Sequence, residues 1–140
     1  MEALLLSIHV LAGIIFVGPV AVVTSLYPRF VGKAPVARVL HRVIRVIRVY
    51  GALALVVPTA GLALGFVQGR MGEVWLIIAM VLTAFAGGLL ALQIVPLQRD
   101  LLDGGGDGAL VRMRVLVGVF NLLWAVVVVL MIVRPGSDYV

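Results

Sequence analysis

The sequence contains no cysteine, and only 12% of its 140 residues are charged. Without cysteine the chain has no disulfide, no thiolate metal ligand and no cysteine nucleophile. Charged residues make up about 25% of an average soluble domain, so this low proportion argues against a surface that faces water. The sequence also shows no catalytic triad and no carboxylate pair within its apolar runs. We therefore predict no catalytic residue, and we do not expect an enzyme.

Apolar residues are abundant instead. They make up 64% of the chain, against about 45–50% in soluble proteins, and the mean hydropathy is +1.25. A membrane span needs about 20 mainly apolar residues, and four stretches qualify, at about 3–26, 47–67, 74–97 and 110–133. Runs of this length indicate helices, because lipid admits only helices and closed barrels. The predicted fold is all-α, an integral membrane four-helix bundle that forms a single transmembrane domain over residues 1–140.

The basic residues are concentrated in one stretch, residues 29–48, between the first two predicted spans. It contains six of the eleven Lys and Arg residues and no acid. Three more basic residues lie in the third connection and the start of the last span, and only Arg70 and Arg134 lie on the opposite side. By the positive-inside rule, the basic connection between helices 1 and 2 is cytoplasmic and both termini are outside. The membrane topology then accounts for the net charge of +5, which does not indicate binding of nucleic acid.

Four arginines of this basic stretch recur at helical spacing and share one face of the amphipathic start of the second helix: Arg38, Arg42, Arg45 and Arg48. One interpretation is a solvated stripe that faces lipid headgroups and only sets the topology. The other is a binding site for anionic lipid or for an acidic partner. Each basic residue near an anionic membrane surface contributes about 1 kcal/mol to such binding.

Small residues predict how the helices pack, because close approach drives helix association in lipid. The third span carries small residues four apart, and we expect them to form the central contact face: Ala79, Thr83, Gly87 and Ala91. The second span offers Gly61 and Gly65. Pro58, and Pro19 after Gly18, predict kinks because proline removes a backbone hydrogen bond.

Ionisable side chains within a span are candidates for function, and His9 is the clear one here. Counted at about 1.5 Å per residue from the predicted outer surface, three other polar residues lie in the same half of the bundle: Thr59, Thr83 and Asn121. One hypothesis is a polar intramembrane cluster with one residue from each helix. The other is that each group only satisfies a backbone carbonyl or a neighbouring helix.

A haem with two histidine ligands is excluded by the predicted topology, because His9 and His41 lie on opposite sides of the hydrocarbon layer of about 30 Å. A b-type haem held by His9 alone remains open. No metal site is predicted, because His9 has no second histidine, cysteine or intramembrane acid near it and the methionines are scattered.

Two segments resemble a known family, and they read LLLSIHVLAGIIFVGPVAVVTSLYPRF and RVIRVYGALALVVPTAGLAL. With them the chain resembles a family of small bacterial four-helix integral membrane proteins of unknown function. It is also distantly similar to the membrane parts of CopD-like copper-resistance proteins and to HemJ-type protoporphyrinogen oxidases. The resemblance implies the four-helix fold. The HemJ type associates a haem with a histidine of the first helix, which would be His9.

The lack of reactive groups and the several packing faces predict a small, non-enzymatic multi-pass protein of the bacterial inner membrane. We expect it to associate with another membrane component, either a membrane-protein partner or a second copy, among lipids that include anionic ones. Two alternatives stay open. One is a b-type haem redox protein that uses His9. The other is a transporter of a small solute or an ion along the polar cluster.

Overall fold

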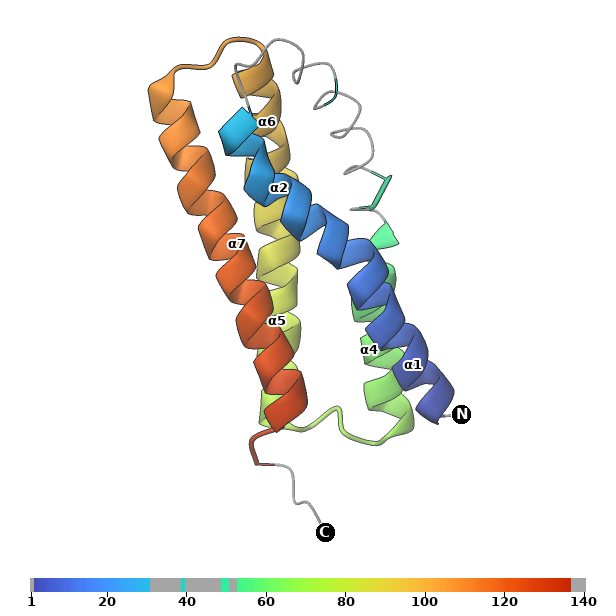
Figure 1. Cartoon of the computed structure of the whole chain (residues 1–140). Helices are drawn as coiled ribbons and strands as arrows, with labels where there is room; N and C mark the ends of the chain where they lie inside the picture. Colours follow the sequence, from blue (N-terminus) through green and yellow to red (C-terminus); the bar gives the residue numbers. More distant parts are fainter. Residues whose placement is uncertain (1, 31–38, 40–48, 51–52, 137–140) are drawn as a thin grey trace.

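The computed structural model describes residues 2–30, 39, 49–50 and 53–136, and these residues form helices joined by turns (Figure 1). No strand occurs among them, so the all-α prediction is confirmed for this part of the chain. Three helices are long and apolar enough to cross a membrane, Ala3–Phe30, Val74–Leu102 and Asp107–Val133, and Val56–Val67 is a shorter apolar helix. The three long helices indicate a multi-pass membrane protein.

The first long helix consists of α1 (Glu2–Ala12), the π-helical turn η1 (Gly13–Val17) and α2 (Gly18–Phe30). It continues beyond residue 26, where the apolar run ends, and it includes Pro28 in its last turn. Tertiary contacts hold this turn in place. Tyr27 and Pro28 are both buried, and the Tyr27 hydroxyl donates a hydrogen bond of 2.6 Å to the backbone carbonyl of Gln98.

The shorter helix, α4 (Val56–Val67), begins just before Pro58. Because Pro58 has no N–H, the Ala54 carbonyl accepts a hydrogen bond from the Val57 N–H at 3.1 Å instead, and residues 54–55 form a turn between the helical residue Leu53 and α4. The helix ends in a Schellman motif at Gly69, whose φ of 67° is left-handed. In that motif the Arg70 N–H donates to the Gly65 carbonyl at 2.9 Å.

The third helix consists of α5 (Val74–Leu89), the π-helical turn η2 (Leu90–Ile94) and α6 (Val95–Leu102), and α7 (Asp107–Val133) follows a tight turn. That turn is a second Schellman motif, in which Gly104 has a φ of 98° and the Gly105 N–H donates to the Asp100 carbonyl at 2.8 Å. The connection is therefore shorter than the interval between the predicted spans 74–97 and 110–133.

The helices form two antiparallel pairs, α1 with α4 and α5 with α7 (Figure 1). We call the end of the molecule where α1 begins and α7 ends the terminal end, and the end that holds Gly104 the Gly-rich end. Toward the Gly-rich end, α2 leaves the first pair and packs against α7. The larger hydrophobic core lies there and includes Val20, Tyr27, Ile94, Met113 and Phe120.

Both π-helical turns precede a proline by the same distance. The last residue of η1 is Val17 and the last residue of η2 is Ile94, and Pro19 and Pro96 follow two residues later. A π-turn inserts one residue into the helix and shifts the backbone hydrogen bonds by one position. The helices accommodate Pro19 and Pro96 in this way and continue beyond them, as α2 and α6.

Candidate functional site

His9 is buried where α1, α4 and α7 meet, with 8% of its surface exposed. Its Nδ1 lies 2.8 Å from the backbone carbonyl oxygen of Val57. A carbonyl can only accept a hydrogen bond, so Nδ1 carries the proton and donates it. In the neutral ring Nε2 then carries the lone pair, and it lies 3.5 Å from the sulfur of Met131. The ring thus connects three helices near the terminal end.

The His9 ring rests directly on Gly61 of α4. A Cβ atom at Gly61 would lie 2.9 Å from Cε1 of His9, closer than real Cβ atoms come to neighbouring atoms, and 3.3 Å from Nδ1, which is also tight. Glycine at this position therefore lets α1 and α4 approach closely enough for the hydrogen bond to Val57. Gly65, one turn further, contacts Leu76 and Met71 in the same manner.

The other three polar residues of the predicted cluster have partners elsewhere. Thr59 is exposed and donates to the carbonyls of Leu55 and Val56 at 3.0 and 2.9 Å. Thr83 donates to the Ala79 carbonyl at 2.7 Å. Asn121 donates from Nδ2 to the Ser25 hydroxyl at 2.8 Å, which connects α7 to α2. Within the described ranges, no hydrogen bond joins any two of His9, Thr59, Thr83 and Asn121.

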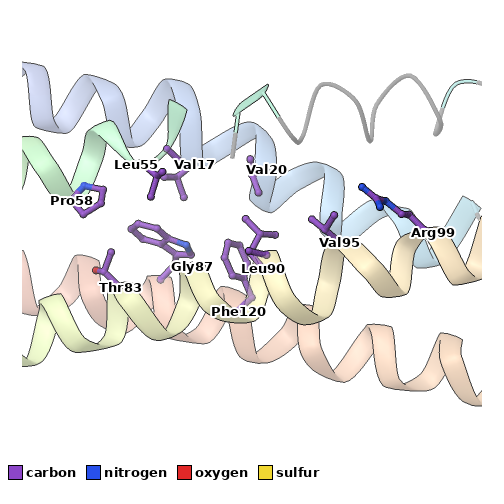
Figure 2. A pocket seen from close by; sticks show the side chains of 13 residues that line it. Val17, Val20, Leu55, Pro58, Thr83, Gly87, Leu90, Val95, Arg99 and Phe120 are labelled. Carbon is purple, nitrogen blue, oxygen red and sulfur yellow. The ribbon is translucent and has the colours of Figure 1, made fainter. Parts of the chain in front are cut away.

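A cavity of about 510 Å³ lies between the two helix pairs, as Figure 2 shows. Seven elements and two residues just before α4 contribute its mostly apolar lining: Val17, Val20, Ala54, Leu55, Pro58, Thr83, Gly87, Leu90, Ala91, Val95, Arg99, Phe120 and Trp124. Thr83 is the one member of the predicted polar cluster in this lining.

One stripe of the third helix runs along the whole cavity, with lining residues four positions apart: Thr83, Gly87, Ala91, Val95 and Arg99. The small-residue face of this helix was predicted to contact other helices, and only part of it does so. Ala79 is fully buried, as predicted. At Gly87, however, the prediction is wrong, because no atom of the described ranges outside its own helix turn lies within 4 Å of a Cβ placed there. The two helix pairs diverge at this depth and leave the stripe open.

Few polar groups reach the cavity. The exposed Arg99 lies at one end of the stripe, and Thr83 lies at the other (Figure 2). Trp124 also lines the cavity, and its buried indole N–H has no hydrogen-bond partner among the residues that the structure describes.

The π-helical turns border the same cavity. Two lining residues, Val17 and Val20, lie on either side of Pro19. Leu90 and Ala91 belong to η2, and Val95 follows it directly. The Val95 N–H donates to the Leu90 carbonyl, but Pro96 has no N–H to make the next bond, to Ala91. Sequence reasoning predicted a kink at Pro19 but missed both π-turns. A proline inside each of two long apolar runs was the signal that could have indicated them.

The packing around His9 does not fit the haem that the resemblance implies. A haem iron would have to bind Nε2 of His9, the ring nitrogen that carries the lone pair, and Met131 already occupies the space next to this atom. Nε2 of His9 and the Met131 sulfur are only 3.5 Å apart. A haem on His9 alone would have to displace Met131 from the nitrogen that binds iron, at a ring that is already enclosed by three helices.

The other predicted site residues lie outside the described residues: Arg38, Arg42, Arg45 and Arg48, and with them His41. Where the structure does describe the chain, no group of three or more His, Cys, Asp or Glu side chains is placed to hold a metal ion. The cavity and the His9 contact are therefore the two features from which function can be argued. No family model, curated protein or solved structure matches the chain, so the function proposed below rests on this geometry.

Proposed function

We propose that this chain is a non-enzymatic bundle of four transmembrane helices in the bacterial inner membrane that works by associating with another membrane component. The observation that carries this proposal is the apolar cavity between the two helix pairs. Its polar lining consists of a threonine bonded to a carbonyl, one arginine and one indole N–H. A site of this composition offers no nucleophile with an adjacent base, which bond-breaking chemistry would need, but it can bind.

The outer surface supports the same proposal. In the three long apolar helices, only 17% to 22% of the most apolar stretch is buried inside the molecule. Large apolar side chains on all four helical segments are instead exposed, for example Ile14, Phe66, Phe85, Leu92 and Ile132. Such a surface needs lipid or protein around it, because its exposure to water is unfavourable.

The proposed orientation follows from charge. Arg99, Arg112 and Arg114 lie at or near the Gly-rich end, and we assign that end to the cytoplasm by the positive-inside rule. The terminal end would then be outside, with the ion pair of 3.5 Å between Arg70 and Glu73 at its surface.

Cysteine labelling can test this orientation, since the native chain has no cysteine and gives no background. A side chain at Gly106 would meet no described atom within 4 Å of its Cβ position, and Pro135 is exposed beyond the end of α7. We expect a membrane-impermeant maleimide to label Pro135→Cys in intact spheroplasts and to label Gly106→Cys only after lysis. The reverse pattern would overturn the orientation and would place His9 in the cytoplasmic half.

The association itself is tested by purification in a mild detergent. We expect blue-native electrophoresis to show a species larger than the monomer, or mass spectrometry to find a lipid or protein that co-purifies in a constant ratio. A monomer that carries neither would contradict the proposed function. The haem and transport alternatives gain no specific support from geometry, because His9 is enclosed and because Thr59 and Asn121 do not line the cavity.

A further inference from the structure

The shape of the cavity restricts what could fill it. From Thr83 to Arg99 its stripe covers sixteen helical steps, about 24 Å at 1.5 Å per residue. One lipid leaflet contributes about half of the 30 Å hydrocarbon layer. The volume of about 510 Å³ lies within the range of about 300–1,000 Å³ that is typical of ligand sites. The cavity is therefore long enough for an extended chain that enters from one membrane surface.

The lining requires an apolar occupant along most of this length. Gly87 and Ala91 expose backbone and a single methyl group, and no neighbouring atom lies within 4 Å of the Cβ position of Gly87. Water gains little in such a space, because it needs two to four polar partners. A hydrocarbon chain, in contrast, restores the dispersion contacts that the lining atoms otherwise lack.

One end of the cavity carries a positive charge. Arg99 lies in the last turn of α6, at the Gly-rich end. Among the described residues, the single ion pair joins Arg70 to Glu73 at the opposite end of the molecule. Arg112, a nearby cation, donates to the side chain of Gln93 at 2.7 Å. Arg99 forms no ion pair within the described part of the chain, although Asp100 and Asp103 follow it one and four residues later. Its guanidinium can therefore bind phosphate or carboxylate oxygens in a fork-like geometry.

We propose that the cavity binds one acyl chain of an anionic membrane lipid, with the acidic headgroup on Arg99 and the chain along Ala91 and Gly87 toward Thr83. This inference rests on the proposed function and identifies the membrane component as a lipid. Charge complementarity at Arg99 selects the anionic headgroup, and the open small-residue stripe accommodates the chain.

Trp124 provides the measurement, because it lines the cavity and Trp75 is the only other tryptophan. The experiment uses the full chain with Trp75→Phe in nanodiscs of phosphatidylcholine. Phosphatidylglycerol or phosphatidylcholine with brominated chains is added at equal mole fractions, and quenching of Trp124 fluorescence is recorded. We expect stronger quenching by the brominated anionic lipid, with saturation at a low mole fraction.

Two variants and one control locate the site. Arg99→Gln is expected to weaken the apparent affinity for the anionic lipid about fivefold, the contribution of one basic residue near an anionic surface. Gly87→Leu fills the cavity and should abolish the saturable quenching. Arg114→Gln removes an exposed arginine of α7 that does not line the cavity, and it should leave the quenching unchanged. Far-UV circular dichroism confirms that each variant keeps its helix content.

Equal quenching by both brominated lipids, or equal losses in Arg99→Gln and Arg114→Gln, would overturn the lipid site. If a protein still co-purified in a constant ratio, only this inference would fail and the proposed function would stand. If no protein and no lipid accompanied the purified chain, both would fail.

Discussion

Gly61→Ala is expected to lower the free energy of unfolding by about 1–3 kcal/mol, the usual effect of overpacking a closely packed site. The new methyl group would lie 2.9 Å from Cε1 of His9. His9 cannot move away without loss of the hydrogen bond of 2.8 Å to the Val57 carbonyl or the contact of 3.5 Å with Met131. The helices α1 and α4 must therefore separate. Reversible unfolding in SDS with mixed micelles measures the change.

Gly118→Ala is the matched control, because Gly118 lies within α7 and has no atom within 4 Å of its Cβ position. Alanine is the better helix former, by roughly 0.5–1 kcal/mol, so this substitution should be neutral or slightly stabilising. The double variant His9→Ala, Gly61→Ala should be more stable than the sum of the two single effects predicts, because the methyl group then meets no ring. Additive effects would show that His9 and Gly61 are not in contact.

Gln98→Met is expected to raise the free energy of unfolding by about 1–3 kcal/mol, the penalty for a buried polar group without a partner. Gln98 is fully buried in α6, and no described residue forms a hydrogen bond with either polar atom of its side-chain amide. Methionine has a similar length and carries no group that must be satisfied. The bond from the Tyr27 hydroxyl survives, because it ends on the backbone carbonyl of Gln98. Thermal unfolding in detergent, followed by circular dichroism, checks this result.

Gln93→Met provides the comparison for Gln98. Gln93 is exposed in η2, within the same long helix as Gln98, and its side chain accepts a hydrogen bond from Arg112. Its replacement should change stability by no more than about 1 kcal/mol, as for most exposed positions. If Gln98→Met were destabilising instead, the amide would have a partner in the membrane-bound protein, such as a buried water molecule.

Helical character could be predicted from the chain alone because it is a local property. Long apolar runs without charge indicate helices whatever the packing, and three of the four predicted spans are long helices in the structure. Their ends were less predictable. The first helix includes Pro28 and the third extends to Leu102, because buried contacts such as the one between Tyr27 and Gln98 hold turns that are no longer apolar.

The glycines show most clearly what depends on the tertiary structure. Gly61 and Gly87 both belong to small-residue patterns within apolar runs, and both were expected to lie at helix contacts. In the structure Gly61 touches His9, whereas Gly87 faces a cavity. Spacing along a helix determines which residues share a face, but it does not determine which neighbour that face meets. That depends on how two helix pairs are rotated and where they diverge.

The partners of His9 could not be predicted for the same reason. One partner is a backbone carbonyl 48 residues away, and every residue has such a carbonyl, so no side-chain pattern indicates it. The other is Met131, a residue that looks like any apolar member of the last span. The chain's own pattern of apolar runs and charges predicts the helical class and the proposed orientation. Contacts between distant helices decide that His9 is an enclosed packing residue and that the open site lies along Gly87.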